Sequence, residues 1–282
     1  MMLIDGKAIS AATRADIKAQ VDSLRERGIT PGLAVIIVGD DPASRVYVNN
    51  KKKACAELGI MSEEYALPAS TNEKELTDLI ETLNAREDID GILCQLPLPR
   101  HLDEKAVINT IAPEKDVDAF HPVNVGKIMI GDYSFLPCTP AGVMELLRRS
   151  DIDVCGKNCV VIGRSNIVGK PMSMLLLHAN ATVTVCHSRT VGIKDICRNA
   201  DVIVAAVGKA GFVTADMVKE GAVVIDVGMN RNAQGKLCGD VDFAAVSEKA
   251  SAITPVPGGV GPMTITMLMQ NTVTAAKSRL GL

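Results

Sequence analysis

Residues 159–171 read Cys-Val-Val-Ile-Gly-Arg-Ser-Asn-Ile-Val-Gly-Lys-Pro, and three leucines at 175–177 follow them. This pattern predicts a buried strand, a turn at Gly163 and then a helix. The order is typical of a dinucleotide site, because the free N–H groups and positive dipole at a helix N-terminus attract a pyrophosphate. The match to G-x-G-x-x-G is imperfect, since Ser165 takes the second glycine position and Gly169 comes one residue late. A plain tight turn therefore remains an alternative.

Apolar runs on both sides of this turn favour the cofactor interpretation. Three of them, at 182–186, 202–207 and 223–227, follow the turn, and two others, at 33–38 and 91–96, precede it. Helical patterns lie between the runs. Such βαβ alternation predicts parallel sheets that are covered by helices and joined by right-handed crossovers. We therefore expect an α/β fold.

The length of 282 residues predicts two domains. Thr139 and Pro140 read as the cap and first residue of a helix, and we place the hinge there. Residues 1–139 are expected to form an N-terminal α/β domain with a parallel sheet, and residues 140–263 a Rossmann-like domain. The helical pattern at 264–282 is expected to return to the first domain and pack against the opening helix.

The end of the second strand of the Rossmann-like domain indicates which dinucleotide binds. An NAD site usually has an acidic residue there, which holds the ribose hydroxyls. Ser188 and Arg189 occupy this place instead, and Arg164 adds a second cation. Hydroxyl and guanidinium groups suit a 2′-phosphate, so the sequence favours NADP. The alternative is that Ser188 and Arg189 are ordinary loop residues.

A candidate acid/base group lies in the first half of the chain. On a helix that begins near Pro42, Tyr47 and Lys51 are four residues apart and share a face. Gln95 and Asp118 follow the ends of later segments, and ligands of parallel sheets gather at the carboxyl ends of the strands. The alternative for residues 51–53 is a solvated lysine run.

A loop rich in proline and glycine, at 255–262, precedes the last helical pattern. Glycines allow the backbone to approach a flat ligand closely, and the following helix N-terminus adds free donors. A tight turn between domains is the alternative.

Composition excludes several classes of function. Only 2% of the residues are aromatic, so the core must be aliphatic, as in sheets covered on both faces. A net charge of −3 provides no basic field for nucleic acid. The eight cysteines form no CxxC pair, which indicates reduced thiols and no metal site. Without a long apolar run or a signal-peptide pattern, we expect a cytoplasmic protein with no membrane partner.

Five blocks, taken together, resemble the bifunctional methylenetetrahydrofolate dehydrogenase/cyclohydrolase family. They lie at 41–51, 95–99, 115–118, 163–171 and 257–264. The similarity spans nearly the whole chain. It implies a folate-binding catalytic N-terminal domain, an NADP-binding Rossmann domain and a cleft between them. It also implies tetrahydrofolate derivatives as substrates, NADP as cofactor and a homodimer.

The resemblance further implies roles for single residues. Lys51 would be the general acid/base and Gln95 would orient it. Asp118 would grip the pterin, and Tyr47 would stack on the aminobenzoyl ring. Further substrate-binding positions would be Ser44, Cys94, Leu96, Pro257, Gly258, Gly259, Val260 and Gly261. The cofactor-binding positions would be Gly163, Arg164, Ser165, Ser188, Arg189 and Met229.

Two departures from the family pattern concern Ala119, where glycine is common, and Met229, where isoleucine is common. Three rival interpretations remain. A short-chain dehydrogenase also uses Tyr-xxx-Lys, but there the pair follows the glycine loop, whereas Lys51 precedes Gly163 here. The other two are a dehydrogenase without cyclohydrolase activity and a catalytically silent protein that binds folate or NADP.

Overall fold

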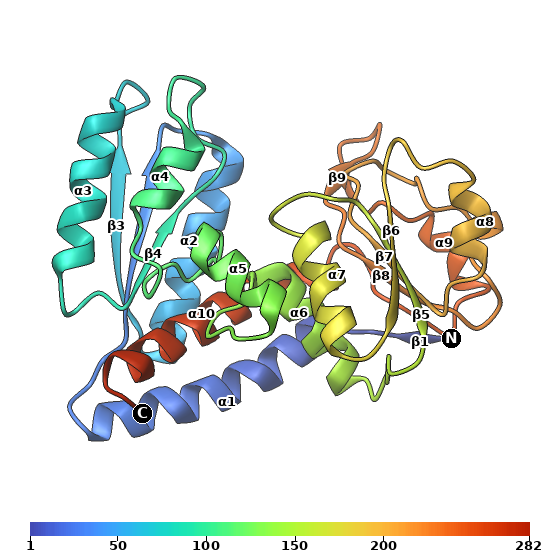
Figure 1. Cartoon of the computed structure of the whole chain (residues 1–282), viewed down its shortest axis with the longest axis horizontal. Helices are drawn as coiled ribbons and strands as arrows, with labels where there is room; N and C mark the ends of the chain where they lie inside the picture. The colour runs from blue at the N-terminus through green and yellow to red at the C-terminus, as the bar shows by residue number, and fades with distance from the viewer. The chain divides into compact units, whose positions relative to one another are not determined.

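The computed structural model describes residues 1–282, apart from the side chain of Ala43, and divides into two compact units. Ala12–Cys138 and Ile265–Leu282 form one, called here the three-stranded unit. Met1–Ala11 and Thr139–Thr264 form the other, the six-stranded unit. Helices flank a parallel sheet in each unit, which confirms the expected α/β fold (Figure 1).

The sheet of the three-stranded unit has the order β3-β2-β4. Its strands are β2 (Gly32–Val38), β3 (Met61–Leu67) and β4 (Gly91–Cys94), all parallel. Every residue of β2 is buried, as its unbroken apolar run predicts. β3 and β4 lie on opposite sides of β2, so right-handed crossovers place the connecting helices on opposite faces. These are α2 (Pro42–Leu58) and α3 (Glu73–Ala85).

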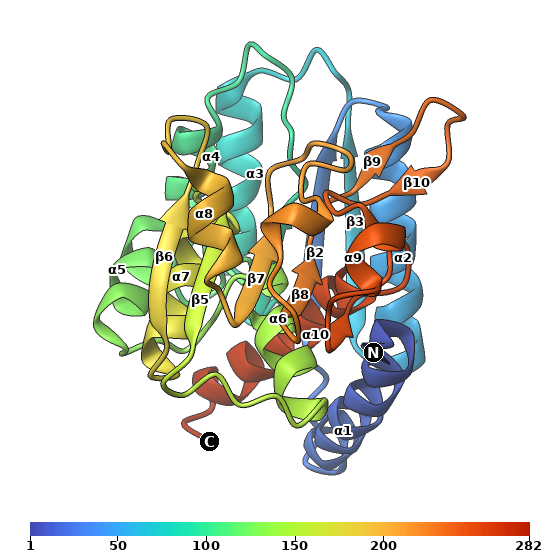
Figure 2. The ribbon, with the colours of Figure 1, turned by 90° about the vertical axis from the view of Figure 1, so that its right-hand side faces the viewer.

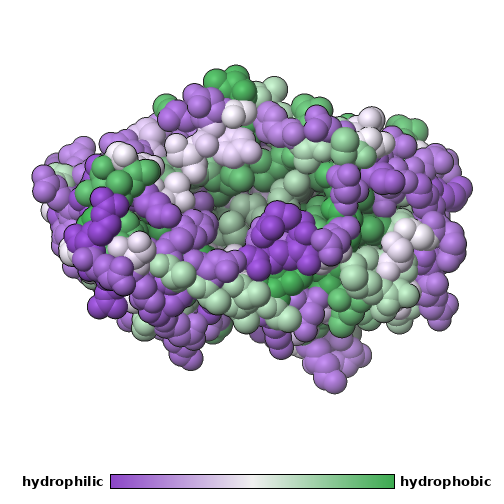
Figure 3. Space-filling model, turned by 90° about the horizontal axis from the view of Figure 1, so that it is seen from below, coloured by the Kyte–Doolittle hydropathy of each residue, from purple (hydrophilic) through white to green (hydrophobic). Residues whose placement is uncertain are grey.

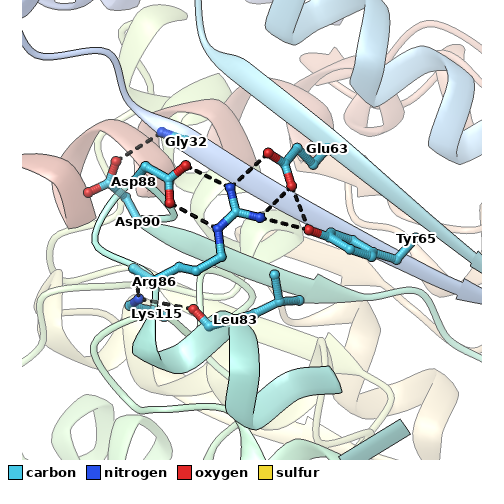
Figure 4. A network of polar contacts seen from close by, with 8 residues as sticks. All are labelled: Gly32, Glu63, Tyr65, Leu83, Arg86, Asp88, Asp90 and Lys115. Atoms are coloured by element: carbon cyan, nitrogen blue, oxygen red, sulfur yellow. Dashed lines mark hydrogen bonds and ion pairs between the residues drawn. The ribbon is translucent and has the colours of Figure 1, made fainter. Parts of the chain in front are cut away.

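Strand β3 has no apolar run, and the sequence interpretation missed it. It is an edge strand whose Glu63 and Tyr65 belong to a polar network (Figure 4). The Arg86 guanidinium donates two hydrogen bonds to the Glu63 carboxylate, at 2.7 and 2.8 Å, and two to Asp88, at 2.9 and 2.6 Å. Arg86 lowers the pKa of both carboxyl groups. Charge pairing at an edge hides the alternation that usually reveals a strand.

The six-stranded unit is a parallel sheet in the order β1-β11-β8-β7-β5-β6. Figure 2 shows its strands β6, β5, β7 and β8 side by side. The strands are β1 (Met2–Leu3), β5 (Asn158–Ile162), β6 (Thr182–Cys186), β7 (Val202–Ala205), β8 (Val223–Asp226) and β11 (Ala252–Ile253). The four longest coincide with the predicted apolar runs to within two residues.

The first eleven residues belong to the six-stranded unit, which differs from the expected assignment of 1–139 to one domain. β1 adds to the sheet beside β11, where Met2 N donates to Ser251 O at 2.6 Å and Ile4 N to Ile253 O at 2.9 Å. A strand of two residues is too short to produce a periodic pattern.

The opening and closing helices contact each other within the three-stranded unit. They are α1 (Gly6–Glu26) and α10 (Val260–Arg279). The Gln20 and Gln270 side chains are hydrogen-bonded at 3.2 Å, and Lys277 Nζ donates to Gln20 Oε1 at 2.8 Å.

Shorter elements complete the fold: α4 (Glu104–Thr110), α5 (Pro122–Ile130), α6 (Cys138–Arg149), α7 (Gly169–His178), α8 (Ile193–Arg198), η1 (Ala215–Met217), β9 (Asn230–Arg231), β10 (Leu237–Cys238) and α9 (Phe243–Ser247). α6 begins one residue before the predicted cap. Among the described residues, no helix combines the length and apolar character needed to cross a bilayer. The face in Figure 3 mixes hydrophilic and hydrophobic residues.

Candidate active site

Lys51 is held in a buried position by helix α2. The helix begins with Asp41 as its N-cap, whose carboxylate accepts from Ser44 N at 2.8 Å, and with proline at the first helical position. Lys51 is only 9% exposed, and its Nζ donates to Gln95 Oε1 at 2.9 Å. Gln95 Nε2 donates in turn to Leu96 O at 2.6 Å. The amide is therefore fixed with its oxygen toward the amine.

Asp118 reaches the same part of the three-stranded unit along an extended segment beside β4. Asp116 forms a parallel bridge with Ile92, and Ile92 N donates to Lys115 O at 2.8 Å. Lys51 and Asp118 influence each other electrostatically. Burial lowers the pKa of Lys51 and raises that of Asp118, and in each case the opposite charge of the partner resists the shift. The opposite charges of Lys51 and Asp118 therefore favour each other's ionised form.

Neighbouring lysines differ from Lys51 in their surroundings. Lys52 and Lys53 are exposed, and Lys52 pairs with Glu64 at 2.7 Å. Lys115 is also buried, but its Nζ donates to the backbone oxygens of Leu83 and Arg86 (Figure 4). Those bonds give Lys115 a structural role, whereas Lys51 faces a side-chain amide and a carboxylate.

Ala119 adopts a left-handed backbone conformation, with φ of 57°, and is fully buried. Glycine adopts this conformation without strain, while alanine pays about 1–2 kcal/mol. Ala119 N donates to Asp116 O at 3.0 Å, which holds the turn that carries Asp118. The turn therefore forms with alanine in place of the family's usual glycine.

Two partners of this turn were missed in the sequence. Cys138 Sγ lies 3.6 Å from Asp118 Oδ1, and burial raises the pKa of this thiol well above its usual value. Asn271, on α10, donates to Val117 O at 2.7 Å and to Leu136 O at 2.8 Å. No clear signal in the sequence pointed to Asn271, because it is one of several polar residues in the pattern that forms α10.

Other predicted substrate residues lie on the same elements. Tyr47 is partly exposed one turn before Lys51, and Ser44 is buried one turn earlier still. Cys94 ends β4 directly before Gln95, and burial raises the pKa of its thiol to about 12. The unit thus gathers Tyr47, Lys51, Gln95 and Asp118 around the carboxyl end of its sheet.

The predicted dinucleotide turn lies between β5 and α7 and has the close packing that such a site needs. A Cβ on Gly169 would stand 2.3 Å from Gly163 O, so no side chain fits. Gly163 has φ of 132°. Ser165 Oγ accepts from Val168 N and Gly169 N, at 3.2 and 3.3 Å. Backbone can therefore approach a pyrophosphate here, which fits NADP.

Ser188 and Arg189 are exposed directly after β6, in a turn that is closed by its own side chains. His187 N donates to Thr190 Oγ1 at 2.8 Å, and Arg189 N donates to His187 Nδ1 at 3.1 Å. Gly163 N donates to Cys186 O at 2.8 Å, so this turn adjoins the glycine turn. Both residues are free to meet a phosphate.

The loop at 257–261 belongs to the six-stranded unit, and its last two residues open α10. A Cβ on Gly6 would lie 1.8 Å from Gly259 O, so α1 packs tightly on this loop. Met229, which follows β8, is 51% exposed, and its sulfur would lie 3.9 Å from a Cβ on Gly261. The loop and the predicted cofactor residue Met229 are thus neighbours.

Two family models match most of the chain. Residues 4–118 match the model described as tetrahydrofolate dehydrogenase/cyclohydrolase, catalytic domain, and residues 137–280 match the NAD(P)-binding domain of the same family. The chain is 61% identical over 280 residues to bifunctional protein FolD of Ruminiclostridium cellulolyticum, with 99% of both chains covered. It is 63% identical over 275 residues to that of Acetivibrio thermocellus, with 98% of this chain and 96% of the relative covered.

Solved structures agree. The bifunctional FolD of Campylobacter jejuni superposes with a TM-score of 0.97 at 53% identity and covers 99% of both chains. The Trypanosoma brucei enzyme, complexed with NADP cofactor and an inhibitor, superposes with a TM-score of 0.95 at 42% identity and covers 100% of this chain and 99% of its own.

Proposed function

Since the chain belongs to the tetrahydrofolate dehydrogenase/cyclohydrolase family, we propose that Lys51 is the acid/base group of its hydrolytic reaction. The protein is a bifunctional enzyme that oxidises methylenetetrahydrofolate to methenyltetrahydrofolate with NADP and then hydrolyses the product to formyltetrahydrofolate. The observation that carries the proposal for Lys51 is its buried hydrogen bond to Gln95, at 2.9 Å.

Hydrolysis needs a proton acceptor and then a donor, and Lys51 serves as both. Water attacks the methenyl carbon, and neutral Lys51 Nζ takes a proton from the water. The same proton passes to the folate nitrogen as the carbon–nitrogen bond breaks. The hydroxyl proton of the intermediate leaves to solvent, and the formyl group remains on the other nitrogen. A lowered pKa provides the neutral amine closer to neutral pH. Gln95 holds Lys51 Nζ in place during both proton transfers.

The remaining residues of the three-stranded unit position the folate. Asp118 accepts hydrogen bonds from the amino-pyrimidinone edge, where charge-assisted bonds are strong. Tyr47 stacks on the aminobenzoyl ring, for which its partly exposed ring is suited. Ser44, Cys94 and Leu96 complete the proposed substrate-binding set of this unit. On the six-stranded unit, the proposed substrate-binding positions are Pro257, Gly258, Gly259, Val260 and Gly261.

The six-stranded unit holds the cofactor, which supplies the hydride acceptor when bound. The backbone of Gly163 and Ser165 receives the pyrophosphate at the N-terminus of α7. Ser188 and Arg189, with Arg164, receive the 2′-phosphate. Met229 lines the nicotinamide end.

An assay with purified protein tests the function directly. Methylenetetrahydrofolate and NADP are expected to yield NADPH, followed by formyltetrahydrofolate without accumulation of the methenyl intermediate. Both absorbance and chromatography report the products. Accumulated methenyltetrahydrofolate would identify a dehydrogenase without hydrolytic activity, and no turnover with either NADP or NAD would contradict the enzyme assignment.

Replacing Arg189 with alanine tests the choice of cofactor. Loss of a charge-assisted bond to the 2′-phosphate is expected to raise the KM for NADP about 10- to 100-fold. The KM for NAD, which lacks this phosphate, should stay within a factor of about two. Arg198→Ala is the matched control, because Arg198 is exposed on α8 and pairs with Asp195. If Arg189→Ala raises the KM for NADP and the KM for NAD by the same factor, Arg189 does not bind the 2′-phosphate.

We also propose a homodimer that forms along β6. This strand is the outer edge of the six-stranded sheet, and Val185 is 37% exposed there. An unpaired edge with an exposed apolar side chain is a surface for strand pairing. Light scattering should find a dimer for the natural chain and a monomer for Val185→Lys. Val191→Lys, in the 91% exposed position after the strand, should remain dimeric. If the Val185→Lys variant is still a dimer, the dimer interface does not lie along β6.

The cytoplasm is the compartment that we propose for the enzyme. All eight cysteines are free, and six of them are buried. Free thiols persist where the surroundings are reducing.

A further inference from the structure

Asp240 is a fully buried carboxylate whose oxygens are occupied by the loop after β7. Oδ2 accepts from Val207 N at 2.6 Å and from Gly208 N at 3.0 Å. Oδ1 accepts from Lys209 N at 2.8 Å and from Asn230 Nδ2 at 2.8 Å. Three successive backbone donors from the loop after β7 and one side-chain amide from the start of β9 thus converge on one carboxylate.

A second buried carboxylate, Asp226, holds Asp240 itself. Asp226 Oδ1 accepts from Asp240 N and Gly228 N, both at 2.9 Å, and Oδ2 accepts from Val241 N at 3.0 Å. Burial raises the pKa of Asp226 to about 6, although three backbone N–H groups oppose the shift. Asp240 is the clearer residue to substitute, because it contacts the loop after β7 directly.

Glycines line both carboxylates because no side chain fits beside them. A Cβ on Gly228 would stand 2.3 Å from Asp240 Oδ1, and a Cβ on Gly239 would stand 1.8 Å from Asp226 Oδ2. Neither glycine could therefore carry a side chain without displacing one of the two carboxylates, which together with their hydrogen-bond partners are called the clamp here.

The clamped loop touches the dinucleotide turn. A Cβ on Gly163 would stand 2.3 Å from the backbone oxygen of Ala206, and Ala206 directly precedes Val207. Ala206 N also donates to Ile162 O at 2.8 Å, and Val227 N donates to Ala205 O at 2.9 Å. The backbone that Asp240 holds, at 207–209, therefore directly follows the residue against which Gly163 packs. On its other side, Asn230 adjoins Met229.

We propose that Asp240 is a positioning residue for NADP, which fixes the loops after β7 and β8 so that they form one wall of the cofactor site. This inference rests on the proposed NADP site of the six-stranded unit. Asp240 does not touch the cofactor in this scheme. It acts through the backbone of 206–209 and through Asn230, because ordered loops bind without a further loss of conformational entropy.

Calorimetry of the full chain with NADP alone tests the proposal. Asp240→Asn replaces one acceptor by a donor that faces backbone N–H groups, so its Kd for NADP should rise about 10- to 100-fold. Hydrogen exchange at 207–209 should quicken in the same variant. Hydrolysis of added methenyltetrahydrofolate, which consumes no NADP, should keep its rate. Asp242→Asn is the matched control, because Asp242 is exposed and asparagine caps α9 equally well.

The outcomes separate this proposal from the site that it rests on. Natural protein that fails to bind NADP would contradict the proposed function. If the natural protein binds NADP and the Asp240→Asn variant binds it with equal affinity, the positioning role of Asp240 is overturned and the proposed NADP site is not. If Asp240→Asn does not fold, as judged by circular dichroism, Asn230→Ala decides: it removes only the 2.8 Å bond to Asp240. A raised Kd then supports the clamp, and an unchanged Kd overturns it.

Discussion

Replacing Lys51 with methionine is expected to lower the kcat for hydrolysis of methenyltetrahydrofolate about 100- to 10,000-fold, the contribution typical of a positioned acid/base group. Methionine fills similar space without an ionisable amine. The variant should fold as well as the natural chain, because a buried lysine with a lowered pKa opposes folding when it is protonated. NADP affinity should not change. Lys53→Met, at an exposed position on the same helix, is the matched control.

The pH dependence of hydrolysis gives a second measure of the same substitution. Burial lowers the pKa of Lys51 from the usual lysine value near 10.5, so the neutral amine forms at a lower pH than in an exposed lysine. The hydrolysis rate of the natural enzyme should therefore rise with pH through the pKa of Lys51, after subtraction of the uncatalysed rate. Lys51→Met should lose this limb. A variant that hydrolyses the methenyl substrate at the original rate would exclude Lys51 from the reaction.

Replacing Asp118 with asparagine should impair both reactions together, since both use the grip on the pterin. We expect kcat/KM to fall about 100-fold, or about 2.7 kcal/mol, for oxidation and for hydrolysis. Most of the loss should lie in KM. The fold should persist, because burial already disfavours the charged form of this carboxyl and raises its pKa. Steady-state kinetics with each folate substrate measure the effect.

Asp78→Asn serves as the control for this substitution, because Asp78 is an exposed partner of Lys74 on α3. A variant at Asp118 that loses hydrolysis but keeps its KM for methylenetetrahydrofolate would refute the anchoring role. Such a result would instead place Asp118 in the proton chemistry of Lys51.

The sequence predicted the parts of the fold in which local pattern and burial agree. β2 and β6 were recognised because their residues form apolar or β-branched runs, and α2 was expected to begin near Pro42, as it does. β1 was missed because two residues carry no period. β3 was missed because its charged residues, Glu63 and Glu64, pair with cations on helix α2 and at the end of α3. The charged side chains of an edge strand are paired with residues that lie far away in the sequence, so the local pattern does not reveal them.

Site prediction followed a similar division. The spacing of Tyr47 and Lys51 places them on one helical face, but the contact between Lys51 and Gln95 joins residues 44 positions apart. That pairing was expected only through the family resemblance. Asn271 and Cys138 are 133 positions apart, and both support the turn of Asp118. Long-range polar contacts of this kind depend on how the strands are ordered, which no periodicity encodes.

Helices α1 and α10 each start in the six-stranded unit and end in the three-stranded unit. Each unit is consequently assembled from two separate stretches of the gene. A gene segment for residues 1–138 includes most of the three-stranded unit but also strand β1, which belongs to the six-stranded sheet. It lacks the part of α10 that supplies Asn271. No single excision or transfer of coding sequence delivers one complete unit. The two units are therefore expected to require one continuous chain, and expression of residues 1–138 alone should yield neither unit whole.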